Sequence, residues 1–226
     1  MGQSHFLGRW IGGSTMENRR REHKKKFERP VGTKRPEKTF LILCEGTKTE
    51  PNYFRSFHVI SAQVEIVGTA MNTMSLVNHA REVVKDRPDE YDEIWLVFDK
   101  DSFDRDIFNE AVFFCETHYR QGFRAAYSNE AFEIWYLLHF ELIKKSISRF
   151  HYPDMLSKRL GFFYKKNHPH MYNVLLSRQP AAIQNAKKLY SQRSPSPARD
   201  NPSTTVFMLV EELNKHLRKK YKKVQK

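Results

Sequence analysis

Acidic residues end two short apolar runs of the sequence. Residues 40–44 are followed directly by Glu45. Residues 94–98 are followed by Asp99, and Asp101 comes two positions later. Runs of about five apolar, partly β-branched residues are typical of strands covered on both faces of a parallel sheet. Ligands bind where the carboxyl ends of such strands meet, and carboxylates gathered there repel one another unless a proton or a cation compensates them.

A hard divalent cation, Mg²⁺ or Mn²⁺, is the compensation that this pattern favours. Such ions prefer oxygen ligands, and the spacing of Asp99 and Asp101 lets both carboxylates turn towards one ion at a strand end. An ion held there binds a scissile phosphate and lowers the pKa of an attacking water. Glu45 would complete the ligand shell or act as general acid or base. Acids at strand ends are also common turn formers, so the Asp-x-Asp spacing alone is a weak signal.

The elements that would position these acids follow a regular order from Thr39 onwards. Besides the two strands above, apolar patterns predict strands at 64–67 and 123–127. Helices are predicted at 51–59, 73–85, 104–119 and 129–142, with Thr73 or Ser75 as the cap of the second. Alternating strands and helices predict an α/β fold with a mostly parallel, Rossmann-like sheet, right-handed crossovers and flanking helices.

The chain after Glu141 has a different composition. Helices are predicted at 181–191 and 202–220, with a loop at 194–200. We therefore expect a basic arm at 1–38, an α/β core at 39–142, a mostly helical extension at 143–220 that packs on the core, and a basic tail at 221–226. Basic blocks of this kind bind polyanions or form solvated surfaces. Met16 is an alternative start of the protein.

The charge balance indicates the class of partner. The formal net charge is +13, from 39 lysine and arginine against 26 acidic residues. Such an excess favours a polyanion, nucleic acid above all, over a small acidic metabolite. Cys44 and Cys115 are too few and too far apart for a disulfide framework or a zinc cluster. The lack of a disulfide framework is typical of proteins in a reducing compartment. No apolar run approaches the roughly 18 residues of a membrane span, so we expect a cytoplasmic protein with no membrane partner.

Four segments, taken in order and spacing, resemble the RloB-like proteins. They are LCEGTKTEPNYF, FDKD, SNEAFEIWYLLHF and NPSTTVFMLVEEL, and the resemblance extends from about Thr39 to Leu217. RloB-like proteins are small Toprim-like proteins encoded in bacterial restriction and phage-defence loci. A strand ending in Glu-Gly, followed later by one ending in Asp-x-Asp, also resembles the Toprim domain of topoisomerases, DnaG-type primases and OLD-family nucleases. The resemblance implies a Toprim-like fold, Mg²⁺ or Mn²⁺ as cofactor, and nuclease activity.

The resemblance also implies roles for individual acids. The corresponding acids of Toprim enzymes bind metal and carry out acid–base steps, which implies these roles for Glu45, Asp99 and Asp101. OLD-family nucleases have another glutamate shortly after the first, which implies Glu50 as a metal ligand. As an acid beside Pro51, Glu50 equally suits the first turn of a helix, facing its dipole. Topoisomerases have a glycine soon after the Asp-x-Asp, and this sequence does not. The resemblance therefore does not imply strand passage.

Glu133 is the acid of the predicted helix 129–142 that we assign to catalysis. One helical turn after Asn129, its side chain is expected to point towards the strand-end cleft and to position metal or water. Glu130 is expected to be a solvent-facing acid of the first turn. His139, within an apolar run, is expected in the core rather than in the site.

Several residues are candidates for contact with nucleic acid. The stretch 144–166 combines basic residues with aromatic rings, which suits single-stranded or flexible nucleic acid, although an ordinary basic surface has the same composition. Predicted helix starts near 129 and 203 could hold phosphate through backbone donors or simply be caps. The candidate residues are Lys48, Lys100, Asn129, Lys165, Lys166, Ser203 and Thr204.

These observations lead to three hypotheses of function. The first is a Mg²⁺- or Mn²⁺-dependent nuclease that cleaves DNA or RNA in anti-phage defence by abortive infection. The alternative is a non-catalytic nucleic-acid-binding or regulatory subunit that assembles with an ATPase encoded nearby. The third is a nucleotidyl transferase or primase-like enzyme. The sequence has no Walker-type glycine loop, so ATP hydrolysis would have to come from a partner.

Overall fold

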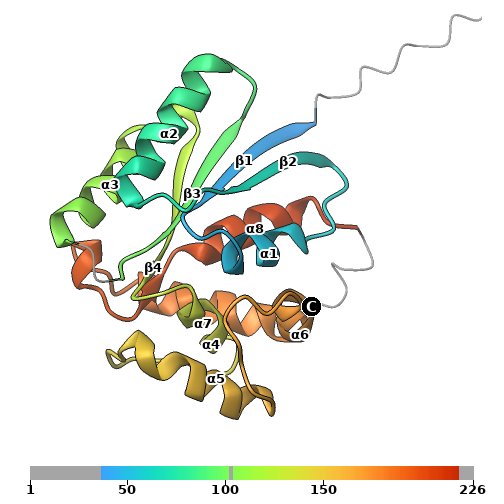
Figure 1. Cartoon of the computed structure of the whole chain (residues 1–226), viewed down its shortest axis with the longest axis vertical. Coiled ribbons are helices and arrows are strands. Elements are labelled where there is room, and N and C mark those ends of the chain that lie inside the picture. The colour runs from blue at the N-terminus through green and yellow to red at the C-terminus, as the bar shows by residue number, and fades with distance from the viewer. Residues whose placement is uncertain (1–36, 102–103, 219–226) are drawn as a thin grey trace, which may run out of the picture. The chain divides into compact units, whose positions relative to one another are not determined.

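A sheet of five strands forms the centre of the described part of the chain. The computed structural model describes residues 37–101 and 104–218, in which the strands are β1 (Lys38–Cys44), β2 (Ala62–Gly68), β3 (Glu93–Asp99), β4 (Phe123–Asn129) and β5 (Ser203–Thr204). Their order across the sheet is β2-β1-β3-β4-β5. β1 to β4 are parallel, and β5 is antiparallel to β4. The prediction of a mostly parallel, Rossmann-like α/β fold is confirmed (Figure 1).

Helices connect the strands and cover the sheet. The first four are α1 (Thr49–Arg55) after β1, α2 (Thr73–Asp86) after β2, α3 (Arg105–Thr117) after β3 and α4 (Glu133–Leu137) after β4. The later part of the chain forms α5 (Tyr152–Leu160), α6 (Met171–Leu175), α7 (Gln179–Tyr190) and α8 (Val206–Lys215). Short 3-10 turns lie at Tyr119–Gln121, Arg149–His151, Leu176–Arg178 and Pro197–Arg199.

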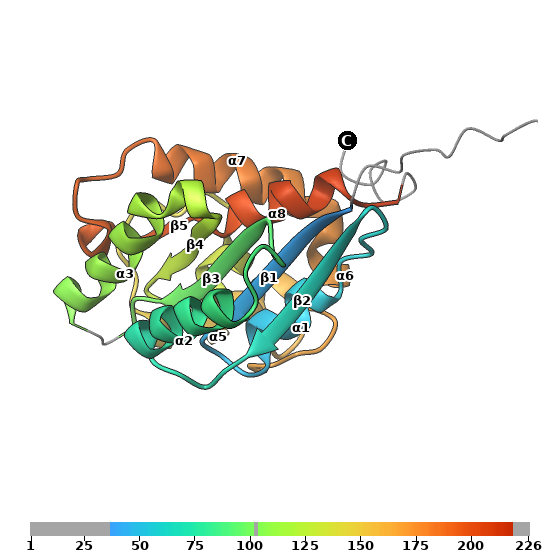
Figure 2. The same cartoon turned by 90° about the horizontal axis from the view of Figure 1, so that it is seen from above.

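Each face of the sheet has its own hydrophobic core. Side chains alternate along a strand, so Phe40, Ile42 and Cys44 of β1 face one core and Leu41 and Leu43 face the other. α2 and α3 cover the second core, while α1 and α4 to α8 contribute to the first (Figure 2). Because both faces of β1 and β3 are covered, these strands appear in the sequence as continuous apolar runs.

Three predicted helices are present with different ends. The helix predicted at 51–59 begins at Thr49 and ends at Arg55. Asn72, rather than Thr73 or Ser75, caps α2, because its side-chain oxygen accepts the Ser75 N–H at 2.9 Å. α3 begins after Asp104 instead of at it, since the Asp104 carboxylate accepts the Asp106 N–H at 2.7 Å.

The prediction of a helix at 129–142 is wrong. Asn129 is the last residue of β4, and only Glu133–Leu137 is α-helical. The Asn129 amide donates to the main-chain oxygen of Ala198 at 3.1 Å, which holds this residue in the strand. Beyond α4, the His139 N–H donates to Tyr136 O at 3.2 Å, a tighter i to i−3 pattern that does not continue the α-helix.

The helix predicted at 202–220 is also shorter, because its first part is a strand. Ser203 and Thr204 form β5, and α8 begins at Val206 and ends at Lys215. Thr205 satisfies the outer edge of β4: its hydroxyl accepts the Tyr127 N–H and donates to Ala125 O, both at 2.9 Å. Backbone pairing with β4 therefore takes precedence over the Asn-Pro-Ser helix start that the local sequence favours.

The segments predicted as α/β core and helical extension share one hydrophobic core. Leu209, Val210 and Leu213 of α8 pack in the same core as Phe40 and Ile42 of β1. The predicted arm, apart from residues 37 and 38, and the predicted tail lie outside the described residues. In the described part of the chain, no helix combines the length and apolar character that a membrane crossing requires.

Burial of His139 predicts a pH dependence of stability. His139 is 2% exposed, as expected for a core residue, and its Nδ1 hydrogen-bonds to Trp135 O at 2.9 Å. Burial lowers its pKa from 6.5 to about 4, so between these values the unfolded chain takes up a proton that the folded protein does not. Stability therefore falls with falling pH, and the His139 contribution changes by about 2 kcal/mol between roughly pH 7 and pH 5.

Urea unfolding of the wild type and of His139→Asn at both pH values checks this expectation. Asparagine keeps a donor for Trp135 O but does not titrate. The wild type should lose about 2 kcal/mol more than the variant on acidification. Parallel stability curves for the two proteins would show that His139 is not the titrating group.

Candidate active site

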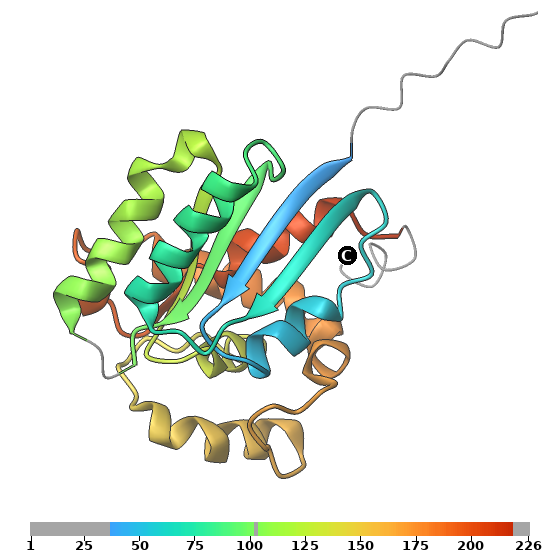
Figure 3. The same cartoon turned by 45° about the horizontal axis from the view of Figure 1, so that its top comes forward.

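The carboxyl ends of β1 and β3 lie side by side and place two of the predicted acids together. Cys44 of β1 is aligned with Val97 of β3, and the Glu45 N–H donates to Val97 O at 2.9 Å. Asp99 is the last residue of β3, and its N–H lies 3.4 Å from Glu45 Oε2. The parallel register thus brings together acids that are 54 residues apart. Figure 3 shows these strand ends at one edge of the sheet.

Glu50 joins these acids from the first turn of α1. It is 8% exposed, and its carboxylate lies where a side chain on residue 46 would be. A Cβ on Gly46 would lie 2.8 Å from the Glu50 carboxyl carbon. A side chain at position 46 would therefore displace the Glu50 carboxylate, and the backbone here is not left-handed. The two interpretations of Glu50 are compatible, since the first-turn acid of α1 also faces the site.

Glu133 reaches the same place from the start of α4. It is 6% exposed, and the Tyr164 hydroxyl donates to Glu133 Oε1 at 3.2 Å. Glu133 lies near the strand ends, as expected. The predicted helix 129–142 is not present, but the shorter helix α4 begins at Glu133 itself. Tyr164 is buried and comes from the extension, so nothing in the local pattern around Glu133 indicated it.

We call Glu45, Glu50, Asp99 and Glu133 the carboxylate cluster; the pKa values of the first three are raised in the fold. The pKa of Asp99 lies well above its usual value, first because of burial and then because of the charges of Glu50 and Glu133. Burial raises the pKa of Glu45 to about 7, with a further contribution from Glu50. Burial and Glu133 also raise the pKa of Glu50, against the attraction of Lys166. Asp99 is enclosed by these groups but keeps partial exposure, so a ligand can reach it.

Main-chain and hydroxyl donors orient two members of the carboxylate cluster. The Phe132 N–H donates to Asp99 Oδ2 at 3.1 Å and favours its ionised form. The Thr73 hydroxyl, at the start of α2, is 3.5 Å from Glu45 Oε2. Thr73 is 1% exposed, whereas the sequence indicated it only as a possible helix cap.

Asp101 lies apart from the carboxylate cluster. Its backbone is left-handed, with φ of 46°, and its N–H donates to Glu130 O at 2.8 Å. Its carboxylate forms an ion pair with Arg149. Aspartate tolerates this backbone conformation better than most residues. The Asp-x-Asp spacing therefore does not place both aspartates on one ion here, because the chain turns sharply after Asp99.

Glu130 is not the solvent-facing acid that the sequence suggested. Its Oε2 accepts the Arg149 N–H at 2.9 Å, and its Oε1 accepts from the Asn201 amide at 3.1 Å. Glu130 thus ties together two segments that are distant in the sequence. The helix prediction at 129–142 was the source of the error.

The candidate nucleic-acid ligands differ in how far they are exposed to solvent. Lys48, Lys165 and Lys166 are exposed, the first at the start of α1 and the others just after Tyr164. Lys100 is 9% exposed, and burial lowers its pKa. Asn129, Ser203 and Thr204 are at most 3% exposed and stabilise the β4–β5 pairing, where the hydroxyls of Ser128 and Thr204 are 3.1 Å apart. The structure thus assigns the last three an internal role.

The chemistry of the carboxylate cluster fits a hard divalent cation, although its geometry is not that of a finished metal site. All its donors are oxygens, and burial and neighbouring carboxylates disfavour ionisation of Glu45, Glu50 and Asp99, which a cation would offset. Within residues 37–101 and 104–218, however, no three His, Cys, Asp or Glu side chains are arranged so that they could hold one ion. The carboxylates interact electrostatically without converging on a single point.

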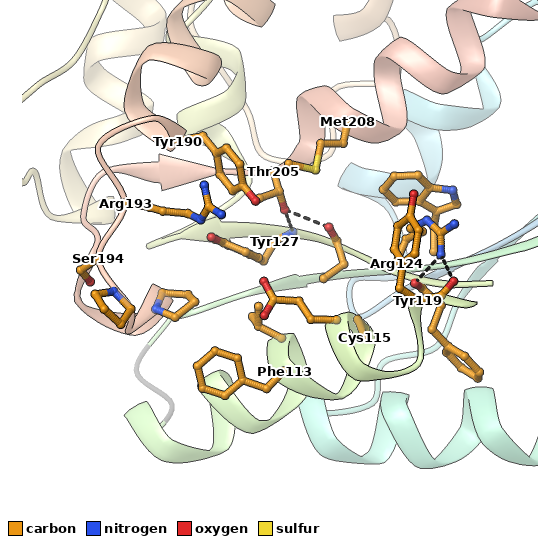
Figure 4. Close-up of a pocket in the computed structure, with 17 residues that line it drawn as sticks. Phe113, Cys115, Tyr119, Arg124, Tyr127, Tyr190, Arg193, Ser194, Thr205 and Met208 are labelled. Carbon is orange, nitrogen blue, oxygen red and sulfur yellow. Dashed lines mark hydrogen bonds between the residues drawn. The ribbon is translucent and has the colours of Figure 1, made fainter. Parts of the chain in front are cut away.

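A partly open cavity lies elsewhere in the fold. It has a volume of about 470 Å³ and lies beyond the outer edge of β4, between α3, α7 and α8 (Figure 4). Its lining includes Tyr119, Tyr127, Tyr190 and Arg193, and none of the predicted site residues. The carboxylate cluster is thus separate from this cavity.

Comparison with known proteins gives one result. A model of the family described as "RloB-like protein" matches residues 40–213 of this chain. Searches of curated proteins and of solved structures found no match.

Replacing Gly46 by alanine is expected to displace Glu50 from the carboxylate cluster. The new methyl group would occupy the space of the Glu50 carboxylate. We expect Mn²⁺ affinity, measured by calorimetric titration, to fall by about 10-fold or more, as it does when groups that orient metal ligands are changed. The double variant Gly46→Ala, Glu50→Ala removes the clash and should be more stable than Gly46→Ala alone. Unchanged Mn²⁺ affinity in Gly46→Ala would contradict the expectation.

Neutralising Asp99 is expected to stabilise the metal-free protein. The pKa of Asp99 is raised in the fold, so stability falls as the pH rises above the usual value of 3.8. Asp99→Asn removes this loss and keeps an acceptor for the Phe132 N–H. In EDTA near pH 8 we expect a gain on the order of 1 kcal/mol, or about 2–4 °C in Tm.

The same thermal measurements contain their own controls. The Tm difference between Asp99→Asn and the wild type should disappear near pH 4, where both side chains are neutral in the fold. Added Mn²⁺ should raise the Tm of the wild type but not of the variant. A variant less stable than the wild type at pH 8 would show that repulsion does not dominate the carboxylate cluster.

Proposed function

Because the chain belongs to the RloB-like protein family, we propose that its carboxylate cluster is the active centre of a Mg²⁺- or Mn²⁺-dependent nuclease. The substrate would be a phosphodiester of DNA or RNA, and the setting would be abortive-infection defence against phage. The observation that carries the proposal is the gathering of four acids, three of them with raised pKa values, near the ends of parallel strands in a protein of net charge +13.

The residues that would hold the cation are Glu45, Glu50, Asp99 and Glu133. When bound, the ion would supply Lewis-acid polarisation of the phosphate and a water of lowered pKa. The chain's own residues orient the ligands: Tyr164 fixes one oxygen of Glu133, and the Phe132 N–H fixes one oxygen of Asp99. Glu45, whose pKa of about 7 lies near neutrality, is suited to hold and release a proton during the reaction.

Asp101 remains a predicted ligand, with a second role suggested by its partner. The Arg149 guanidinium forms an ion pair with Asp101. A guanidinium binds phosphate through two parallel hydrogen bonds. Arg149 is therefore suited to bind a phosphate of the nucleic acid, which would free Asp101 for the metal.

One observation favours a second function, that of a non-catalytic nucleic-acid-binding or regulatory subunit. Among the described residues, no three potential ligands are arranged to hold a metal ion. A protein of this kind would use its basic surface for binding and would depend on another component, such as an ATPase from the same locus, for activity. We also propose that the protein acts in the cytoplasm, where its nucleic-acid substrate would be.

The experiment that separates these functions is a cleavage and binding assay on purified protein. Single-stranded and duplex DNA, RNA and tRNA would be incubated with Mn²⁺ or Mg²⁺ and with the wild type, Asp99→Asn or Glu45→Gln. We expect cleavage by the wild type and a loss of about 10²-fold or more in either variant, the range found for acid–base groups. Glu82→Gln is the matched control, because Glu82 is an exposed acid of α2.

The outcomes are distinct. Equal cleavage by Asp99→Asn and wild type would refute the nuclease assignment of this site. Tight binding without cleavage, under all conditions and by all proteins, would support the regulatory subunit. Incorporation of labelled nucleotide would indicate a nucleotidyl transferase instead.

A further inference from the structure

Two phenylalanine rings stand out from the surface at the two ends of α5. Phe150 is 80% exposed and Phe163 is 73% exposed, more than any other large hydrophobic side chain in the described part of the chain. Burying a phenylalanine side chain is normally favourable by about 1.5–3 kcal/mol. Neither ring contributes this stabilisation to the folded protein, although many other aromatic rings are buried in its core.

Both rings are attached to residues that contact the predicted site. Phe150 follows Arg149, which pairs with Asp101 and whose N–H donates to Glu130 at 2.9 Å. Phe163 precedes Tyr164, whose hydroxyl donates to Glu133. The backbone next to each ring is therefore fixed to the edge of the site. In Figure 3 α5, drawn in gold, lies beyond the arrowheads of the strands, where the site acids are.

The surface around the two rings is mostly basic, although Asp154 of α5 is also exposed and Arg159 forms an ion pair with Glu141 at 2.7 Å. Exposed lysine and arginine side chains come before, within and after α5: Lys144, Lys145, Lys158, Arg159, Lys165 and Lys166. The Arg149 guanidinium lies over the Phe150 ring, 5.5 Å from its centre. A ring flanked by cations offers a base a stacking surface and its phosphate a counter-charge at the same time.

We propose that Phe150 and Phe163 stack on unpaired bases of a single-stranded segment, on either side of the phosphate presented to the carboxylate cluster. The proposal rests on the proposed nuclease function and narrows its substrate to single-stranded DNA or RNA. In a duplex the bases stack on one another, so surface rings do not reach them. In a single strand, loop or end they are free to stack on a protein ring.

A protein partner fits this surface less well. The core of a protein interface is contiguous, apolar and poor in lysine. Here the rings are separated by the whole of α5, a helix of about 14 Å, and lysines lie between and beside them. Separate rings on a basic surface are the arrangement found where proteins hold single strands.

Binding measured in EDTA tests the proposal without cleavage. Fluorescence anisotropy would follow a labelled single-stranded oligonucleotide and a duplex of the same sequence, each as DNA and as RNA. For the wild type we expect tighter binding of the single strand. Phe150→Ala and Phe163→Ala should each weaken single-strand binding by about 5-fold or more, since stacking on one ring contributes at least this much, and should leave duplex binding unchanged.

The control is Phe113→Ala, which removes a ring of α3 that is 41% exposed and lies away from the carboxylate cluster. This variant should bind both nucleic acids as the wild type does. The rings of Phe150 and Phe163 make few contacts, so the Tm of both variants should match that of the wild type. Thermal unfolding of all three variants checks that loss of binding is not loss of fold.

The stacking proposal and the nuclease proposal fail in different experiments. Wild-type affinity of the double variant Phe150→Ala, Phe163→Ala for single strands would overturn stacking while leaving the Asp99→Asn result intact. An equal loss for single strand and duplex would also overturn it, because it would show a general contribution to binding. If the double variant no longer bound an ATPase partner but kept its affinity for single strands, the rings would be identified as a protein contact.

Discussion

Repulsion among four carboxylates at the ends of β1 and β3 is the constraint on which the rest of the site depends. Burial and the neighbouring charges oppose ionisation of Glu45, Glu50 and Asp99, and Glu133 is one of the charges that act on Glu50 and Asp99. A fold gains nothing in stability from such a grouping. The two strands are buried on both faces, and the alternation of their side chains fixes their register. The positions of Glu45 and Asp99 at the strand ends follow from that register.

The parts of the fold that the sequence predicted are those fixed by local pattern. The apolar runs at 40–44 and 94–98 identified β1 and β3, and parallel pairing then placed Glu45 beside Asp99. The parts that it missed are held by distant groups. Asn129 remains in β4 because main-chain oxygens of 197 and 198 accept from its amide. β5 forms because the backbone N–H and C=O groups at the edge of β4 require hydrogen-bond partners. Helix propensity, which is a local property, does not report this requirement.

The same distinction holds within the site. Glu133 was found for a partly mistaken reason, since α4 is short and starts at Glu133 itself. The pairing of Asp101 with Arg149 was not predictable from the Asp-x-Asp spacing, because it depends on a left-handed turn and on a cation 48 residues later. The close approach of the Glu50 carboxylate to Gly46 was also not predictable from the sequence pattern, because it depends on how α1 turns back onto the strand end.

The helical extension takes part in the site rather than only covering the sheet. It supplies Arg149 to Asp101 and Tyr164 to Glu133, and the Thr49 hydroxyl donates to the side chain of Asn167 at 2.7 Å, which joins the start of α1 to it. The sheet therefore provides the acids, and the extension sets their orientation and the surface around them. The groups proposed to bind metal lie before the extension in the chain, and the rings proposed to stack on bases lie within it. Under these proposals, substitutions confined to the extension would alter which nucleic acid is bound while the metal-binding acids themselves stay unchanged.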